Sequence, residues 1–133
     1  MTARGDVLAL QLSRRGVPVS DHVRDVCSLL ARTAVTIQRL AEEECNGPNW
    51  VHSSYATSER LEKWGEDLQR RMDRAEVRFG KQVATLREAV AFADPDGVNK
   101  CLGGWRVFGD PRGSTADIMV TRGDRDEWVA VIE

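Results

Sequence analysis

Apolar side chains recur at helical spacing through most of the first 93 residues of the chain. The opening stretch, from Asp6 to Arg15, has this pattern and is followed by Gly16 and Pro18. Because proline lacks the amide proton that a continuing helix needs, a new element must begin after Pro18. The pattern predicts a short leading helix over about 6–15.

A second apolar stripe predicts a helix of about 24 residues that begins after Ser20. Ser20 is a favourable N-cap, and Asp21 lies near the positive end of the helix dipole. The segment Asn46-Gly47-Pro48 ends the helix, because asparagine and glycine tolerate the left-handed conformation. The stripe consists of Val23, Val26, Cys27, Leu30, Ala34, Ile37, Leu40 and Ala41.

The longest stripe follows a polar loop at 46–57 and predicts a second long helix, with Ser58 as its N-cap. A helix from Leu61 to Ala93 is about 50 Å long, which exceeds what a small sheet can cover. We therefore expect part of the stripe to pack on a second copy of the chain, as a homo-oligomer. Gly80 is the weak point, and it marks either a bend or a close approach by another chain. The stripe steps by three or four through Leu61, Trp64, Leu68, Met72, Ala75, Phe79, Val83, Leu86, Val90 and Ala93.

After residue 94 the hydrophobic period changes from 3.6 to 2, which is typical of strands. Three short strands are predicted at 104–108, 115–120 and 127–132, and their short connections favour an antiparallel meander. We expect Trp64, Trp105 and Trp128 to lie on apolar faces in the core. The fold class is α+β, a single domain with a helical part at about 6–94 and a β part at about 98–133.

Length and composition fit one globular domain that is not generally basic. The chain has 133 residues, a net charge of -2 and a pI of about 5.7. Non-specific nucleic-acid binding usually appears as a basic excess, which is absent overall, although charge can still be segregated locally. No apolar run is long enough to span a membrane, and the N-terminal segment lacks the features of a secretory signal. We expect a soluble, cytoplasmic protein with reduced cysteines.

Motifs of enzymes and metal sites are missing from the sequence. It contains no P-loop, no GxGxxG and no HExxH, and no triad can be assigned from its two histidines, His22 and His52. Cys45, His52 and Cys101 match the spacing of no zinc module. The sequence therefore predicts a non-catalytic protein without a cofactor or a metal site.

The segment Asp110-Pro111-Arg112-Gly113 fits a type I turn between two of the strands. That geometry accounts for Asp110, Pro111 and Gly113 but leaves the choice of Arg112 unexplained. Arg112 could bind a phosphate or a carboxylate together with Ser114 and Thr115. The aromatic side chains of the loop, Trp50 and Tyr55, could then stack on a base.

Two charged surfaces are further candidates for binding. Arg71, Arg74, Arg78 and Lys81 fall at steps of three and four, so they line one helix face that could contact nucleic acid, with Lys63 and Arg70 near its edge. The alternative is a solvated face balanced by Asp67, Asp73 and Glu76. The second surface lies in the last turn of the preceding helix, where the dipole disfavours negative charge. This surface comprises Glu42, Glu43 and Glu44. It could contact a partner, or it could be ordinary surface acidity.

Three segments resemble, in order, a diffuse group of small bacteriophage and prophage proteins. They are IQRLAEEECNG (Ile37–Gly47), SERLEKWGEDLQRR (Ser58–Arg71) and VFGDPRGSTADIMV (Val107–Val120). The group has a helix that ends in Cys-Asn-Gly, a long charged helix and a strand pair around a Gly-Asp-Pro-Arg-Gly turn. The resemblance covers about half of the chain. Residues 1–35 have no counterpart, and the ending TRGDRDEWVAVIE departs from the pattern.

The resemblance implies a bacterial host cell and a role in binding, and it carries no catalytic residues over. Three hypotheses follow. The first is an anti-defence inhibitor, similar to an anti-CRISPR protein, that docks on a host defence protein complex through Glu42, Glu43, Glu44 and Arg112. The second is a sponge that sequesters a nucleotide signal through Arg112, Ser114, Thr115, Trp50 and Tyr55. The third is an accessory protein that binds nucleic acid through Arg71, Arg74 and Arg78.

Overall fold

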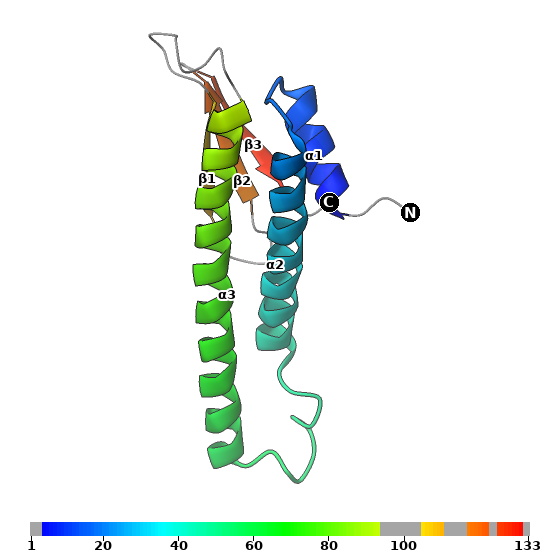
Figure 1. Ribbon diagram of the computed structural model, residues 1–133. Coiled ribbons are helices and arrows are strands. Elements are labelled where there is room, and N and C mark those ends of the chain that lie inside the picture. The colour runs from blue at the N-terminus through cyan, green and yellow to red at the C-terminus, as the bar shows by residue number, and fades with distance from the viewer. Residues whose placement is uncertain (1–3, 94–104, 111–116, 123–124, 132–133) are drawn as a thin grey trace.

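The computed structural model describes residues 4–93, 105–110, 117–122 and 125–131, and it has the predicted α+β architecture. Three helices precede three strands: α1 (Arg4–Arg14), α2 (Asp21–Asn46), α3 (Ser58–Ala93), β1 (Arg106–Asp110), β2 (Asp117–Arg122) and β3 (Arg125–Ala130). Figure 1 shows α2 and α3 as a long antiparallel hairpin, with α1 and the sheet at the end opposite its loop. None of the described helices combines the length and apolarity that a bilayer span requires.

The ends of the helices follow from local capping chemistry. Ser20 Oγ accepts a hydrogen bond of 3.1 Å from the backbone N–H of Val23, which confirms the predicted N-cap of α2. At the start of α3 the expected cap is wrong by one residue. Thr57 Oγ1 accepts from the N–H of Arg60 at 3.3 Å, and the Thr57 carbonyl accepts from Leu61 at 3.0 Å. Ser58 is therefore already in the first turn, because Thr57 offers an equivalent hydroxyl one position earlier.

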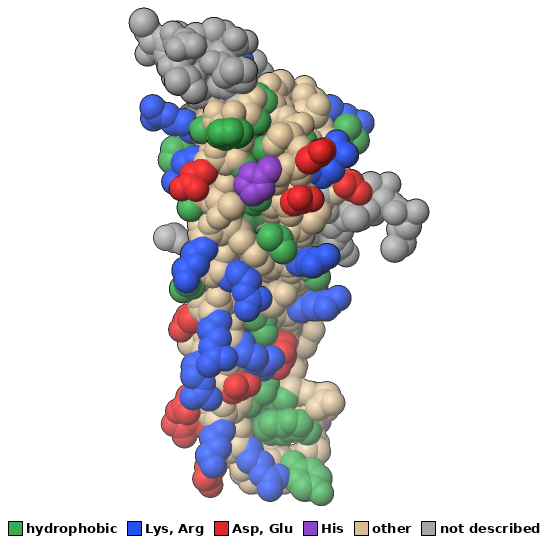
Figure 2. Space-filling model, viewed as in Figure 1, with side chains coloured by type: hydrophobic (Ala, Val, Ile, Leu, Met, Phe, Trp, Pro, Cys, Tyr) green, Lys and Arg blue, Asp and Glu red, His purple; other side chains and the backbone are tan. Residues whose placement is uncertain are grey.

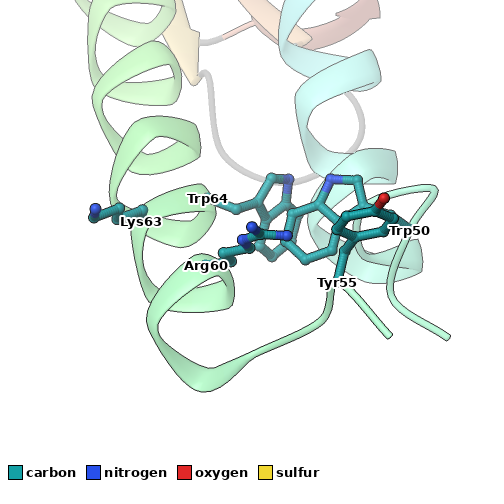
Figure 3. Close-up of a pocket in the computed structure, with 5 residues that line it drawn as sticks. All are labelled: Trp50, Tyr55, Arg60, Lys63 and Trp64. Atoms are coloured by element: carbon teal, nitrogen blue, oxygen red, sulfur yellow. The ribbon is translucent and has the colours of Figure 1, made fainter. Parts of the chain in front are cut away.

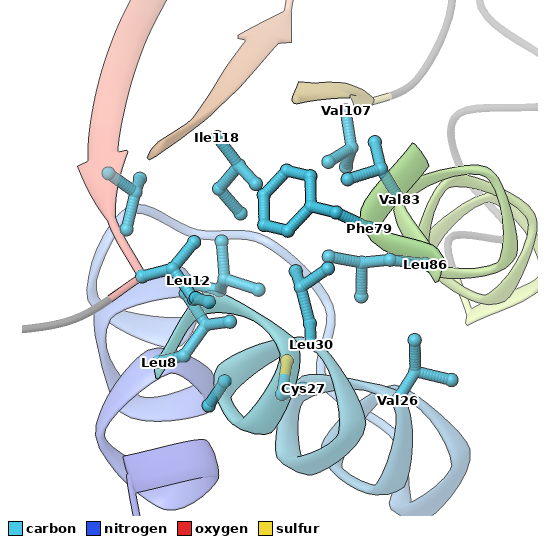
Figure 4. Close-up of a cluster of buried hydrophobic side chains, with 14 of the residues drawn as sticks. Leu8, Leu12, Val26, Cys27, Leu30, Phe79, Val83, Leu86, Val107 and Ile118 are labelled. Atoms are coloured by element: carbon cyan, nitrogen blue, oxygen red, sulfur yellow. The ribbon is translucent and has the colours of Figure 1, made fainter. Parts of the chain in front are cut away.

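The three strands form the expected antiparallel sheet in the order β1-β2-β3. The observed strands lie within about two residues of their predicted positions. Val107, Ile118, Val120 and Val129 are buried on the inner face of the sheet. They meet Leu12, Leu30 and Phe79, so the core lies where the sheet and all three helices converge, as Figure 4 shows.

Trp105 is buried as predicted, but the prediction for Trp128 is wrong. The Trp128 side chain is 60% exposed, while Val129 and Val131 are buried. Both faces of this segment contain apolar residues, so alternation alone did not identify the inner face. The register decides it, because Val129 pairs with the buried Ile118, and Trp128 pairs with Met119 on the outer face.

The apolar stripe of α3 is covered within the chain along most of its length. The stripe residues from Leu68 to Val90 are buried, except for the half-buried Met72, against α2 and, toward the end of the helix, against β1. Because α2 also packs against α3, the sheet does not have to cover the whole apolar stripe. The length of the stripe therefore no longer requires a second copy of the chain. α3 also runs unbroken through Gly80, and no described atom lies within 4 Å of a Cβ built there.

Gly109 is explained by close packing between β1 and α3. A Cβ at this position would lie 2.9 Å from Phe79 Cε1 and still closer to Val83 Cγ2. Both neighbours are buried in the core and have little room to move. A glycine here allows the strand to approach the helix.

The same substitution at Gly109 and Gly80 is expected to change stability in opposite directions. Gly109→Ala should lower the free energy of unfolding by about 1–3 kcal/mol, because the added methyl group overpacks the contact with Phe79 and Val83. Gly80→Ala should raise it by about 0.5–1 kcal/mol, because the exposed helical position gains propensity without a clash. Urea unfolding followed by circular dichroism measures both changes. Equal effects at the two positions would contradict this packing.

Candidate functional site

The loop between α2 and α3 is held by a succession of hydrogen-bonded turns. Gly47 adopts φ 75°, and its N–H donates to the Glu43 carbonyl at 2.8 Å, which closes the end of α2. Val51 N–H donates to the Pro48 carbonyl, and Ser53 donates to the Trp50 carbonyl through both its N–H and its hydroxyl. Ser53 Oγ also accepts from Tyr55 N–H at 3.2 Å. These contacts fix where the loop presents Trp50 and Tyr55.

An open pocket of about 510 Å³ lies between this loop and the first turns of α3. We call it the aromatic pocket, and it is lined by Trp50, Tyr55, Arg60, Lys63 and Trp64. Trp50 and Trp64 are half-buried, while Tyr55 is 63% exposed. In Figure 3 Arg60 lies with the three rings, whereas Lys63 points away from them on α3. The Arg60 guanidinium carbon is 5.2 Å from the centre of the Tyr55 ring, a cation–π contact.

A second, more polar hollow adjoins the aromatic pocket and shares Trp50 and Trp64 with it. Its other walls come from the end of α2 and the start of the loop, and include Arg39, Glu42, Asn46 and Asn49. The two hollows therefore combine exposed aromatic surface with hydrogen-bonding groups at one end of the hairpin.

Glu43 connects the two helices at this end of the hairpin. Its Oε1 accepts a hydrogen bond from Trp64 Nε1 at 3.2 Å and one from an Arg71 guanidinium nitrogen at 3.1 Å. The bond to Glu43 is the main cause that raises the pKa of Arg71, and the nearby charge of Asp67 adds to it. Arg71 therefore stays charged, and it holds Glu43 against α3.

Lys and Arg side chains gather along one face of the hairpin in Figure 2, over α3 and the neighbouring part of α2. On α3, Arg74, Arg78 and Lys81 are exposed at steps of four and three. On α2, Arg32, Arg39 and Glu43 are spaced by seven and four residues, so both arginines lie on the side of α2 that reaches Arg71. We call these five exposed cations, Arg32, Arg39, Arg74, Arg78 and Lys81, the basic face.

The carboxylates of α3 only partly neutralise the basic face. Asp67 binds Arg71 at 3.0 Å and Arg70 at 3.8 Å, so it balances the edge of the face. Asp73 instead accepts from Gln69 and belongs to a separate stripe at steps of three, four and seven with Glu59, Glu62 and Glu66. Within the ranges that the structure describes, the five cations of the basic face form no ion pair. The charges of α3 are thus segregated into two flanks.

The structure separates several residues that the sequence grouped together. Glu42 and Glu44 are exposed, but Glu43 is turned toward Trp64 and Arg71. Arg112, Ser114 and Thr115 lie outside the described residues, as does Cys101 of the discarded metal set. Among the residues that can be placed, no three metal-ligating side chains come together.

Sequence reasoning identified Trp50 and Tyr55 but missed the rest of their pocket. Arg60 and Trp64 are four residues apart on α3, so they share a face at the helix start, beside the loop. That spacing was readable, although Trp64 was interpreted only as core. Arg32 and Arg39 were also missed, because their relation to the basic residues of α3 depends on how the two helices pair.

Cys27 is a core residue and no reactive thiol. It is buried among apolar side chains in Figure 4, and this burial raises its pKa to about 12. Since the thiolate is the nucleophilic form, the buried thiol is inert at neutral pH. Cys45, near the end of α2, is exposed.

Glu43 and Glu44 are expected to differ in their contribution to stability although they are neighbours. Glu43→Gln should lower the free energy of unfolding by about 0.5–1 kcal/mol, because it weakens the charged bond to Arg71 at a half-exposed site. Glu44→Gln is the matched control and should leave stability within about 0.5 kcal/mol of the parent value. Thermal unfolding of the three proteins at low salt measures the difference. A larger loss for Glu44→Gln would contradict the bridging role of Glu43.

Comparisons with protein-family models, with curated proteins and with solved structures find no match to this chain. Its chemistry is therefore inferred from the geometry of its own residues. That geometry offers an aromatic pocket with one stacked cation, and a basic face that begins beside it on the same helix hairpin.

Proposed function

We propose that this protein is a non-catalytic accessory protein that binds nucleic acid through its basic face. The observation that carries the proposal is the set of five exposed cations on two adjacent helices, without carboxylate partners among the described residues. Phosphate groups are the repeating anions that such a set matches, and guanidinium groups bind them through paired hydrogen bonds. The acidic flank of α3 explains how a chain with a net charge of -2 still carries such a surface.

The spacing of the cations is compatible with a polyanion. Successive exposed residues at steps of three and four lie about 5–6 Å apart on a helix, and Arg74 to Lys81 spans about 10 Å along α3. Arg32 and Arg39 extend the face sideways onto α2. An isolated anion would need one or two of these groups, whereas a nucleic-acid backbone can contact most of them at once.

The pocket chemistry supports a binding role over a catalytic one. The aromatic pocket offers stacking surface and positive charge instead of a paired general acid and base. No cofactor enters the proposal. We place the protein in the cytoplasm of a bacterial host, as its resemblance to phage and prophage proteins implies.

We also propose that the protein forms a homo-oligomer. The buried stripe of α3 no longer supports it, but the outer face of the sheet carries a cross-strand row of Phe108, Met119 and Trp128. Phe108 and Trp128 in this row are exposed. A monomer mass by light scattering over a wide concentration range would contradict a homo-oligomer.

Binding of nucleic acid through the basic face is expected to depend strongly on salt. The double variant Arg74→Ala/Arg78→Ala should bind more weakly and reduce the slope of log K against log salt by about 2, because two phosphate contacts are lost. Arg106→Ala, which removes an exposed arginine of β1, is the matched control and should leave the slope unchanged. Fluorescence anisotropy with labelled DNA and RNA at several salt concentrations measures both. An unaltered slope in the double variant would remove the basis of the proposal.

The second candidate is an anti-defence inhibitor that docks on a host defence protein complex. Glu42 and Glu44 favour it, because both are exposed at the end of α2, where the helix dipole does not compensate their charge. Arg112, the fourth contact residue of this hypothesis, lies outside the described residues.

A charge reversal that spares Glu43 tests the inhibitor hypothesis. Glu42→Lys/Glu44→Lys should abolish capture of a host protein complex from a bacterial lysate while the protein stays folded. Glu62→Lys/Glu66→Lys, on the acidic flank of α3, is the control with the same change of charge and should retain capture. Equal capture by all three proteins, identified by mass spectrometry, would exclude this acidic surface as the contact.

A further inference from the structure

We infer that the aromatic pocket receives an unpaired nucleobase, so that the nucleic acid on the basic face is single-stranded. The inference rests on the proposed binding of nucleic acid and specifies which form is bound. Its basis is the placement of three aromatic rings and a stacked arginine next to the basic face. Base pairing hides the faces of bases within a duplex stack, whereas a single strand can offer them to aromatic side chains.

The rings of the pocket, of which Tyr55 is exposed and the two tryptophans are half-buried, are held on a firm frame. Trp50 and Tyr55 belong to a loop closed by its own hydrogen bonds, and Trp64 is anchored through its Nε1 to Glu43. These contacts hold the loop in place, so the aromatic surface stays open to solvent. The volume of about 510 Å³ lies within the range of small-molecule sites, and it exceeds what one base requires.

The charges around the pocket favour a base that carries a phosphate. Arg60 lies over the Tyr55 ring, where it can contact a phosphate while a base stacks on the neighbouring ring surface. The adjoining hollow contains the carboxylates of Glu42 and Glu43, which offset the positive charge of Arg39 on that side. Asn46 and Asn49 in the same hollow offer both donors and acceptors to the edge of a base.

A chain of contacts leads from the pocket to Arg71, which lies one helical turn before the basic face on α3. Trp64 and Arg71 both bind Glu43, and they are seven residues apart on one side of α3, which is about 10 Å along the helix. Arg74 and Arg78 follow on the next turns. A single-stranded nucleic acid with one base in the pocket can therefore place its following phosphates beside these cations.

Binding of three DNA probes separates the pocket from the basic face. The probes are a labelled 12-nucleotide single strand, an abasic strand of the same length and a blunt-ended duplex of two complementary strands. The parent protein should bind the single strand more tightly than either of the others. Tyr55→Leu should weaken binding to the single strand about tenfold and leave binding to the abasic strand unchanged, because only stacking is lost. Trp128→Leu, which removes an exposed aromatic residue from the sheet, is the matched control and should bind like the parent.

The outcomes distinguish the inference from the proposed function. If Arg74→Ala/Arg78→Ala weakens all probes but Tyr55→Leu weakens none selectively, the pocket binds no base and nucleic-acid binding stands. Equal parental affinity for the single strand and the abasic strand also overturns the inference. If AMP itself binds in a Tyr55-dependent manner while the single strand does not bind, the base comes from a free nucleotide. In that case both the inferred single-stranded ligand and the proposed function are wrong. Circular dichroism of each variant confirms that it is folded.

Discussion

The packing of α2 on α3 is the interaction on which the rest of the structure depends. It buries the two apolar stripes against each other, and it leaves the C-terminal part of α3 free to pack on β1. It also brings Glu43 to Trp64 and Arg71, and it sets Arg32 and Arg39 beside the cations of α3. Without this pairing, neither the aromatic pocket nor the basic face would exist as a surface.

The packed core and the aromatic pocket lie at different ends of the hairpin. Phe79, Leu30 and Ile118 lie in the core at the end that carries the sheet, where all elements converge. The other end contributes two helices and a loop, and several of its aromatic residues remain half-buried or exposed. Residues of the aromatic pocket can therefore change without loss of the packed core, which is how many proteins combine a rigid scaffold with variable loops.

The sequence predicted the helices, the order of the strands and most of the core, because each depends on periodicity and local capping. Ser20 and Gly47 mark the ends of α2 by side-chain and backbone chemistry that needs no tertiary contact. Trp128 was assigned to the wrong face because both faces of β3 contain apolar residues, and only pairing with β2 distinguishes them. The pocket was only half predicted, because Trp50 and Trp64 come from elements whose relative position is a tertiary property. The close approach of Gly109 to Phe79 and Val83 could be seen only in the packed structure.

The two charged flanks of α3 have a consequence for how the protein moves in an electric field. Opposite charges on opposite sides of a rod create a lateral dipole moment that its small net charge conceals. Near a polyanion, such a molecule is rotated before contact, so that encounters in a productive orientation become more frequent. Its isoelectric point alone would class it with proteins that nucleic acids repel, although one side of it carries the five cations of the basic face.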